Sequence, residues 1–298
     1  PGWVKFVEYY YPDLIPNLSS AKSPTMMHGS TIKTYMAQEL MNRGELDNPT
    51  QIYNVAIMPC TAKKFEIARE EFNDAATYWK EQGKDWNTLE SMRDMDAILT
   101  VRELADMVRD AGISYADLDS KAQYDDIEGI GSTAGLIFGN TGGVMEAALR
   151  SAHYLVTGRN PDPDAFKIVR SPSFETGVVE AEVQIGDATI HAAVVSGLGN
   201  VRKLLEAIEH GEVHYDFVEV MACPGGCVGG GGQPIHDGEE LAHTRGANLY
   251  FLDKNAKIRF SHENQDVMKL YNDFLEKPLS HKSHMLLHTD HTKWDMPR

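Results

Sequence analysis

The sequence predicts an α/β protein. Two apolar segments, residues 52–58 and 215–221, are bordered by polar residues and have the composition of buried strands. The first is followed closely by a stretch of helical spacing. A third segment, residues 177–196, alternates in polarity and turns at Gly186 and Asp187, as a β-hairpin does. Strands interleaved with helices in this way are typical of α/β folds.

Four stretches carry the helical part of this prediction. Residues 63–72 have helical spacing, residues 89–111 contain a second helical stretch, and residues 143–156 form a third that ends at Gly158. Asn200 is expected to cap a fourth helix over residues 201–209. The expected core contacts are Leu99, Leu104 and Met107 in the second stretch and Val144, Ala147, Ala148, Ser151 and Leu155 in the third.

Charge and length exclude several classes of protein. The 298 residues include 28 Lys and Arg against 44 Asp and Glu, a net charge of −16. Such a chain repels phosphate backbones, so we expect no nucleic-acid partner. We expect no membrane segment either, since no apolar stretch is long enough. The chain opens Pro1-Gly2-Trp3 without Met, so the N-terminal part of the natural chain is expected upstream.

The cysteines are the first candidates for chemistry. There are only three, an odd number that argues against a disulfide framework and favours a reducing compartment, the cytoplasm. Cys60 follows the first strand, and Cys223 and Cys227 follow the second. Thiolates at strand ends suit an iron–sulfur cluster, and the Pro-Gly-Gly spacer frees backbone N–H groups for its sulfides. Three inert buried thiols are the alternative, because a four-thiolate cluster or a zinc site would lack one ligand.

The C-terminal stretch is rich in histidine. Residues 281–298 include His281, His284, His288 and His291. Their spacing could place imidazoles on one helical face, but a solvated tail is the interpretation that the polar flanks favour.

Three motifs carry a resemblance to a known family. The chain reads MPCTAKKFE at residues 58–66, FGNTGGVMEAALR at residues 138–150 and EVMACPGGCVGGGGQP at residues 219–234. In this order they resemble the [FeFe]-hydrogenases, and the resemblance spans essentially all 298 residues, including SHEN at residues 261–264. The family's TSCC motif would lie just before Pro1.

The resemblance implies a cofactor and a fold. The cofactor is the H-cluster, a [4Fe–4S] cube joined through one cysteine sulfur to a two-iron unit with CO, cyanide and a bridging azadithiolate. Cys60, Cys223 and Cys227 would be three ligands of the cube, and Cys227 would also bridge to the two-iron unit. The fourth ligand would precede Pro1. Residues 1–298 would be one catalytic domain of two lobes, each a small twisted β-sheet flanked by helices, with the cofactor in the cleft between them.

The resemblance also implies polar contacts to this cofactor. Lys63 would donate to a cyanide of the distal iron, a charge-assisted bond suited to a dry pocket. Ser23 would donate to the proximal cyanide, helped by backbone near Pro24. Ser19 would belong to the proton relay. Thr25 stands where relatives often have Gln. Without the motifs, Lys63 would be an exposed helix residue and the two serines would belong to a turn, a loop or a helix cap.

The wall of the site is implied to be apolar. Met58, Pro59, Met221 and Phe138 would surround the two-iron unit and exclude water. Each would otherwise be ordinary core at a strand end or in a glycine-rich segment.

The function that follows is reversible H₂ activation, 2H⁺ + 2e⁻ ⇌ H₂. Electrons would come from a ferredoxin-like domain upstream or from electron-transfer subunits, as in a multisubunit complex. One alternative is an H₂ sensor and another is a hydrogenase-like iron–sulfur assembly factor, whose relatives lose the Lys-containing motif and the glycine run that this chain keeps at Lys63 and residues 229–232. A plain electron-transfer module is the least specific alternative. A cytoplasmic location is expected, and a periplasmic one is the alternative.

Overall fold

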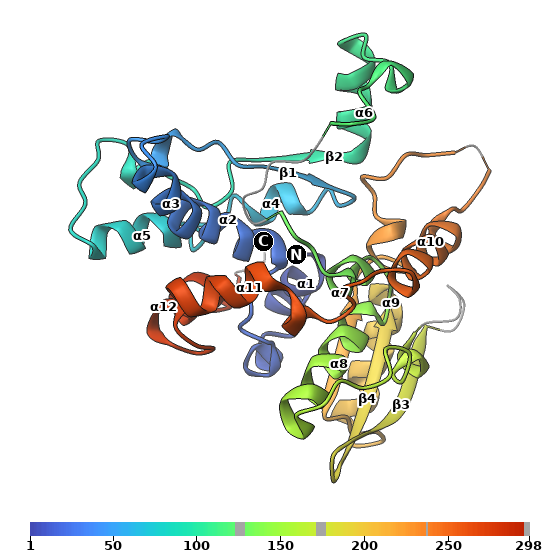
Figure 1. The fold of residues 1–298 in the computed structure, drawn as a ribbon. Helices are drawn as coiled ribbons and strands as arrows, with labels where there is room; N and C mark the ends of the chain where they lie inside the picture. Colours follow the sequence, from blue (N-terminus) through green and yellow to red (C-terminus); the bar gives the residue numbers. More distant parts are fainter. Residues whose placement is uncertain (123–128, 171–176, 237, 295–298) are drawn as a thin grey trace. The chain divides into compact units, whose positions relative to one another are not determined.

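The computed structural model describes residues 1–122, 129–170, 177–236 and 238–294 of the chain (Figure 1). The chain divides into two compact units. Unit 1 consists of Pro1–Gly129 and Met268–Arg298, and unit 2 of Ile130–Val267. Within the described residues, no helix is long and apolar enough to cross a membrane.

Helices outnumber strands in both units. Unit 1 contains α1 (Gly2–Tyr10), α2 (Pro24–Thr31), α3 (Ala37–Asn42), β1 (Val55–Met58), α4 (Lys63–Glu66), α5 (Asp74–Glu81), β2 (Ala97–Thr100), α6 (Val101–Asp110) and α12 (His281–Leu287). Unit 2 contains α7 (Thr133–Leu136), α8 (Gly143–Thr157), β3 (Val178–Ile185), β4 (Ala188–Ser196), α9 (Leu198–Glu209), β5 (Phe217–Met221) and α10 (Ala242–Lys254). Helix α11 (Gln265–Leu270) leads from unit 2 back into unit 1, and a π-helical turn, Ile32–Met36, joins α2 to α3.

The sheet of unit 1 is a parallel pair of strands, β1 and β2. Residues 52–58 were predicted to be buried throughout, and this prediction is wrong for alternate positions. Val55 and Ile57 are 43% and 42% exposed, whereas Ala56 and Met58 pack against a buried cluster of Met26, Phe72, Met95 and Ile98. Only one face of the strand packs against this cluster, so the side chains alternate between core and surface.

Two helix predictions in unit 1 need correction. The helix expected over residues 63–72 ends at Glu66, and the following turns place Arg69 and Phe72 in the interior. Residues 89–111 contain strand β2 as well as helix α6, which begins at a capping box formed by Thr100 and Glu103. Helix α6 buries no residue, and Met107 is 54% exposed, so the core contacts expected of Leu99, Leu104 and Met107 are not fully buried.

The sheet of unit 2 confirms the predicted hairpin. Strands β3 and β4 pair antiparallel, with Ile185 opposite Ala188 across the turn, and β5 lies parallel to β4. Helix α8 packs on one face, where its Met145 and Leu149 contact alternate residues of β3 and β4, and α9 packs against β4. The sheet is therefore covered by helices. Strand β5 leads directly into the loop that follows it.

Helix α8 has the predicted bounds, but only part of the predicted face is buried, with Ala147 3% exposed. It ends at Gly158 in the left-handed conformation (φ 70°), as expected. Ala148 and Leu155 are exposed, however, and the buried residues include the charged pair Glu146 and Arg150. An apolar pattern misplaces the buried face of this helix because ion pairs occupy it. Asn200 does not cap α9: Gly197 precedes the helix, and the Asn200 amide donates to the carbonyl of Ser196 (2.8 Å) from inside its first turn.

The C-terminal segment is not the solvated tail that the sequence favours. Helix α12 buries Leu286 (0% exposed) and Leu287 (9%). His288 then forms a β-bridge with Ala21, and its Nδ1 lies 2.9 Å from the hydroxyl of Ser20. The segment packs against unit 1 because the two leucines that follow the histidine-rich turn are buried, and their burial stabilises the helix.

Candidate active site

The predicted site residues are divided between the two units, and each set is described separately. Unit 1 holds Ser19, Ser23, Pro24, Met58, Pro59, Cys60 and Lys63, and unit 2 holds Phe138, Met221, Cys223 and Cys227.

In unit 1, strand β1 leads directly to the first cysteine. Met58 ends the strand, Pro59 stops the ladder, and Cys60 follows, half-buried and outside any disulfide. Lys63 then begins the short helix α4. The hydroxyl of Thr25 donates to the sulfur of Met58 (3.8 Å), so the residue that replaces the family's common Gln contacts the predicted apolar wall. Pro24 begins α2 and is exposed.

One carboxylate joins the two residues predicted to bind cyanide. Oε2 of Glu66 accepts a hydrogen bond from Nζ of Lys63 (2.6 Å) and another from Oγ of Ser23 (3.0 Å). Lys63 and Glu66 are 9% and 7% exposed. The sequence prediction did not include Glu66, although its position three residues after Lys63 on a helix was the available signal. Lys63 is therefore not the exposed helix residue that the sequence would indicate without the motifs.

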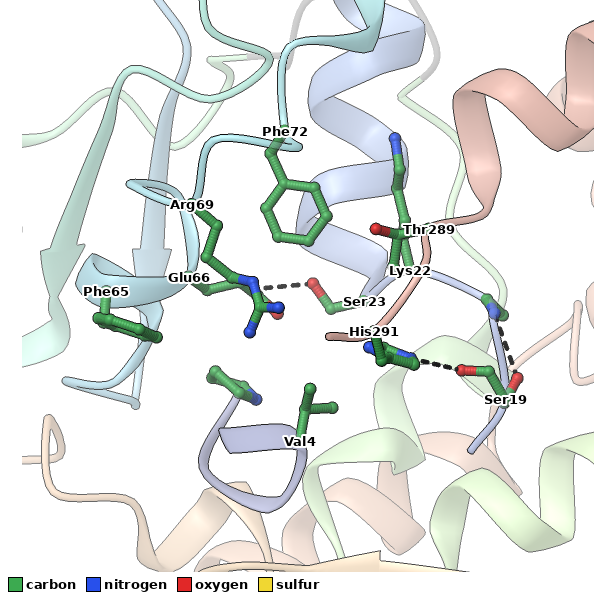
Figure 2. A pocket seen from close by; sticks show the side chains of 12 residues that line it. Val4, Ser19, Lys22, Ser23, Phe65, Glu66, Arg69, Phe72, Thr289 and His291 are labelled. Atoms are coloured by element: carbon green, nitrogen blue, oxygen red, sulfur yellow. Dashed lines mark hydrogen bonds between the residues drawn. The ribbon is translucent and has the colours of Figure 1, made fainter. Parts of the chain in front are cut away.

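The Ser23–Glu66 pair lines a pocket of about 200 Å³ (Figure 2). Ser19 and His291 also line it, and Nε2 of His291 lies 3.0 Å from the carbonyl oxygen of Ser19. Nδ1 of His291 is buried without a hydrogen-bond partner among the described residues. The full lining is Pro1, Val4, Ser19, Ala21, Lys22, Ser23, Phe65, Glu66, Arg69, Phe72, Thr289 and His291. The pocket therefore combines hydroxyl, carboxylate and imidazole groups that can exchange protons.

Arg69 fixes one side of this pocket. Its two terminal nitrogens donate to the two carboxylate oxygens of Glu8 at 2.8 and 2.6 Å, a bidentate pair between α1 and the turn after α4. Burial works against the charge of Arg69, but hydrogen bonds to Glu8 and Glu71 outweigh it and raise the pKa of the guanidinium.

Ser19, which also lines this pocket, is exposed. Its hydroxyl accepts a hydrogen bond from the amide of Ala21 (3.2 Å), as a loop serine does rather than a helix cap.

In unit 2, strand β5 leads to the other two cysteines. Met221 ends the strand, and Cys223 and Cys227 follow on a short loop, both half-buried and neither in a disulfide. Gly225 and Gly226 within this loop have φ values of 76° and 97°, which side-chain-bearing residues rarely adopt. Glycine is therefore strongly favoured at both of these positions in the loop.

The cysteine loop rests on the segment that contains Phe138. The amide of Thr141 donates to the carbonyl of Gly225 (3.2 Å), and a Cβ on Gly226 would lie 2.7 Å from the carbonyl oxygen of Gly139. Phe138 packs against the cluster of Ala134, Ile137 and Ala147. Two segments far apart in sequence, both from the family motifs, are thus in backbone contact.

Glu219 holds the start of α8 against strand β5. Its carboxylate accepts hydrogen bonds from the amides of Gly142 (2.7 Å) and Met145 (2.6 Å), which occupy the N-terminal turn of the helix. Burial raises the pKa of Glu219 to about 7, while these amide hydrogen bonds act in the opposite direction. Glu219 is the first residue of the motif at residues 219–234, and the sequence did not predict it as a site residue.

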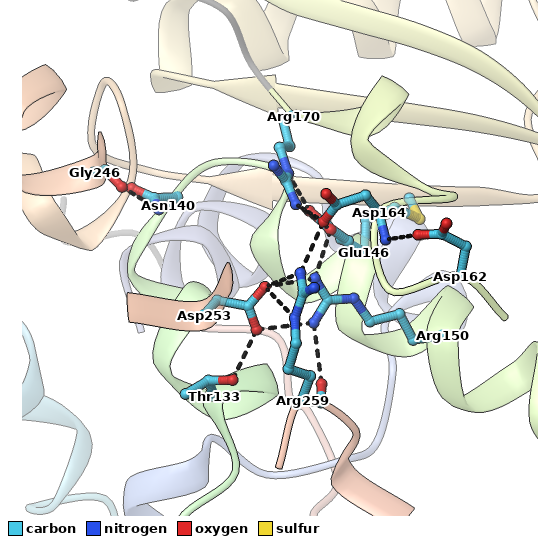
Figure 3. Close-up of polar contacts among 12 residues, drawn as sticks. Thr133, Asn140, Glu146, Arg150, Asp162, Asp164, Arg170, Gly246, Asp253 and Arg259 are labelled. Carbon is cyan, nitrogen blue, oxygen red and sulfur yellow. Dashed lines mark hydrogen bonds and ion pairs between the residues drawn. The ribbon is translucent and has the colours of Figure 1, made fainter. Parts of the chain in front are cut away.

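A buried ion network lies in the same unit (Figure 3). Arg150 of α8 pairs with Glu146 (2.7 Å) and with Asp253 of α10 (2.9 Å), and all three side chains are fully buried. Arg170, Arg259 and Asp164 complete the network. Burial alone would raise the pKa of Asp253, but hydrogen bonds from Arg150, Arg259 and Thr133 lower it to about 2. The network fixes α8 against α10.

The residues present fit the implied cofactor in their donor chemistry. Unit 2 offers two half-buried thiols on a loop whose glycines keep the backbone close-packed, and unit 1 offers a third thiol beside a buried lysine. Among the described residues, no group of three His, Cys, Asp or Glu side chains is arranged to hold a metal ion. The assignment of the cysteines as ligands stays a prediction.

Comparison with known proteins agrees with the motifs. The family described as "Iron only hydrogenase large subunit, C-terminal domain" matches residues 1–231. The chain belongs to the iron-only hydrogenase family. The family described as "Iron hydrogenase small subunit" matches residues 239–294. The hydrogenase homology therefore continues through the C-terminal segment that forms α10 to α12.

Individual relatives are hydrogenases over nearly the whole chain. The NADP-reducing hydrogenase subunit HndD of Solidesulfovibrio fructosivorans is 43% identical over 98% of this chain and 46% of its own length. The periplasmic [Fe] hydrogenase large subunit of Nitratidesulfovibrio vulgaris is 43% identical over 89% of this chain and 57% of its own. A variant of the apo [FeFe]-hydrogenase HydA1 from Chlamydomonas reinhardtii superposes with a TM-score of 0.78 at 36% identity, over 98% of this chain and 74% of that one. The chain spans about half the length of the curated hydrogenases it matches.

A second group of relatives is less similar. The cytosolic Fe–S cluster assembly factor narfl of Xenopus tropicalis is 31% identical over 98% of this chain and 57% of its own length. The hydrogenases and the assembly factors therefore share the domain that this chain forms. Residues at the site must distinguish the two functions.

Proposed function

We propose that this chain is the H-cluster domain of an [FeFe]-hydrogenase and catalyses reversible H₂ formation, 2H⁺ + 2e⁻ ⇌ H₂. The observation that carries the proposal is the convergence of Lys63 and Ser23 on one carboxylate oxygen beside the pocket of unit 1. A buried lysine and a half-buried serine thus lie close enough together to share one anionic partner, and donors of this kind suit anionic ligands such as cyanide. A protein that binds only a [4Fe–4S] cube needs neither donor.

The cysteines are proposed as the attachment points. Cys60, Cys223 and Cys227 would hold the [4Fe–4S] cube together with a fourth ligand that is not among residues 1–298, and Cys227 would bridge to the two-iron unit. When bound, the H-cluster supplies the open iron position and the bridging amine at which H₂ is split or formed. All other contributions come from the side chains of the chain itself.

Lys63 and Ser23 orient and stabilise the anionic ligands. The ammonium of Lys63 is held in place by Glu66, so only part of its hydrogen-bonding capacity is used within the protein, since an ammonium has three donors. Ser23 has one hydroxyl proton and must redirect it from Glu66 to bind a cyanide. Met58, Pro59, Phe138 and Met221 would exclude water, which strengthens these charge-assisted bonds.

Protons must reach the site through polar side chains. Ser19, the predicted relay member, lines the same pocket as Ser23, Glu66 and His291. Transfer between such groups requires contacts of about 3 Å or one intervening water. The hydroxyl of Ser19 and the carboxylate of Glu66 are the groups proposed to pass the proton within unit 1.

Electrons are proposed to arrive from outside this chain. A ferredoxin-like domain or electron-transfer subunits would supply them, because the chain has only three cysteines, all assigned to the H-cluster. The match to a small-subunit family over residues 239–294 supports an origin in a hydrogenase that works as a complex. We propose a cytoplasmic location, because three cysteines, an odd number, argue against a disulfide framework. The relative named as periplasmic supports the other compartment.

The second candidate is an iron–sulfur assembly factor, which the lower-identity relatives favour. It would share the cysteines but have no use for the Lys63–Glu66–Ser23 arrangement. An H₂ sensor would use the same site and differ only in turnover.

The test is an infrared spectrum of the full-length protein, purified without oxygen after co-expression with the family's maturation enzymes. Bands of metal-bound CO and cyanide are expected, and an H₂ production assay then separates catalysis from sensing. Bound iron and sulfide without such bands would favour the assembly factor instead.

A further inference from the structure

Glu219 is the last charged residue of strand β5 before the predicted ligand loop. It lies two positions before Met221 and four before Cys223, and it is 6% exposed. Both of its carboxylate oxygens are used: Oε1 binds the amide of Gly142 and Oε2 binds the amide of Met145. One side chain therefore ties the strand that delivers the cysteines to the start of α8.

The same two segments meet again beyond the strand. The amide of Thr141 binds the carbonyl of Gly225, and the backbone of Gly226 packs against that of residues 139–141 so closely that no Cβ fits. The strand, the cysteine loop, residues 139–142 and Glu219 thus form a closed ring of contacts. Opening the ring at Glu219 removes the two hydrogen bonds that tie strand β5, just before the loop, to the start of α8.

We propose that Glu219 is a positioning residue that fixes the backbone of residues 223–227 for cluster binding. The inference rests on the proposed function, because it concerns the loop that would carry two cube ligands. A [4Fe–4S] cube needs its ligand sulfurs at fixed separations, and residues that orient the ligands contribute to affinity although they do not touch the metal. Glu219 acts on the cysteines only through the backbone.

The substitution Glu219→Gln opens the ring with little change in shape. A glutamine has one acceptor oxygen, and its NH₂ group would face the second amide N–H, donor against donor. Glu209→Gln is the matched control, since Glu209 is an exposed residue at the end of α9 in the same unit. Gly226→Ala is a second variant that opens the ring at its other contact, where the new methyl group would lie 2.7 Å from Gly139 O and Thr141 N.

The experiment uses the full-length protein prepared without maturation enzymes, so that only the cube is bound. Release of iron to a chelator and the electron paramagnetic resonance spectrum of the reduced cube are measured for wild type and the three variants. Glu219→Gln is expected to release iron about fivefold faster or more, the loss of roughly one well-formed hydrogen bond. Gly226→Ala is expected to release iron faster because its methyl group clashes with residues 139–141. Both variants are expected to shift the resonance positions. Glu209→Gln is expected to match wild type.

Hydrogen exchange of the Gly142 and Met145 amides reports whether their hydrogen bonds to residue 219 are intact, independently of the cluster. Faster exchange in Glu219→Gln together with wild-type iron release and an unchanged resonance spectrum would make Glu219 a helix cap only and overturn the inference. An effect in Gly226→Ala but not in Glu219→Gln would overturn it as well. A wild-type protein that takes up no iron and sulfide would overturn the proposed function itself, and this inference with it.

Discussion

Arg150 and Asp253 meet through two hydrogen bonds, Nη1 to Oδ1 at 3.1 Å and Nη2 to Oδ2 at 2.9 Å, with both side chains fully buried. The pair joins α8 to α10 at the centre of the ion network in unit 2 (Figure 3). Buried charges are tolerated only when each is paired and hydrogen-bonded. Glu146 and Arg259 complete the pairing on either side, so the network behaves as one unit.

Asp253→Asn should therefore be strongly destabilising. The variant removes the negative charge shared by Arg150 and Arg259, and breaking a buried pair costs about 3 kcal/mol or more. Urea unfolding of the cofactor-free protein measures the loss. Asp187→Asn, at the exposed tip of the hairpin, is the control and should change stability by less than about 0.5 kcal/mol. Equal stability of the two variants would contradict the role of the network.

Glu219 predicts a pH dependence of stability. Its pKa rises from 4.5 to about 7 on folding, so the folded protein binds the proton more tightly than the unfolded chain does. This contribution is fully present below pH 4.5 and is lost as the pH rises through about 7, by up to about 3 kcal/mol. Unfolding of wild type and Glu219→Gln at several pH values isolates it. The difference between the two proteins should change over this window, and a constant difference would contradict the shift.

The TGG segment before α8 predicts a steric effect. A Cβ on Gly143 would lie 1.8 Å from the carbonyl oxygen of Ile137, whereas Gly135 of α7 has nothing within 4 Å of its Cβ position. Gly143→Ala should cost about 3 kcal/mol because the backbone must move. Gly135→Ala should be neutral or stabilising by up to about 1 kcal/mol, since alanine favours helix. Thermal unfolding of both variants tests the contrast, and similar effects would refute it.

Lys63 and Lys64 form a natural comparison. Lys63 is buried against Glu66, while Lys64 is about half exposed and pairs with Glu103 at the surface. Under the proposed function, Lys63→Met should lower H₂ turnover of the matured protein about tenfold to hundredfold, the loss of one charge-assisted hydrogen bond. Lys64→Met should retain turnover. The cyanide stretching bands should shift in the first variant alone, and normal bands and turnover in Lys63→Met would remove Lys63 from the site.

Cys227→Ser tests the proposed bridge. A serine oxygen is a poorer ligand for iron than a thiolate, so the two-iron unit should not be retained. Infrared spectra should lose the CO and cyanide bands, while Cys60 and Cys223 still permit some iron and sulfide to bind. A full infrared signature in this variant would contradict the assignment of Cys227.

The sequence anticipated the parts of the fold that follow local rules. The hairpin around Gly186 and Asp187 and the end of α8 at Gly158 are set by turn and cap chemistry, which neighbouring residues determine. The buried face of α8 was mispredicted because Glu146 and Arg150 are buried by partners distant in sequence, such as Asp253. Apolar periodicity contains no information about such pairs.

The candidate site divides in the same way. Cysteines at strand ends were recognisable because each follows an apolar run, and the motifs supplied Lys63 and Ser23. Glu66 and His291 were missed, since their contacts with Ser23 and Ser19 span more than forty residues of chain. The histidine segment was misjudged because its packing depends on Leu286, whose buried position no local pattern indicates.

Unit 1 is closed by residues at both ends of the chain, with unit 2 between them. During synthesis, residues 130–267 are complete before Met268–Arg298 leave the ribosome, so unit 2 can fold while unit 1 still lacks α12 and His291. Thr289 and His291, which line the pocket in unit 1, are thus made after the whole of unit 2. A nascent chain released before Met268 would still contain Cys223 and Cys227 of unit 2 but would lack Thr289 and His291 of the pocket around Ser19.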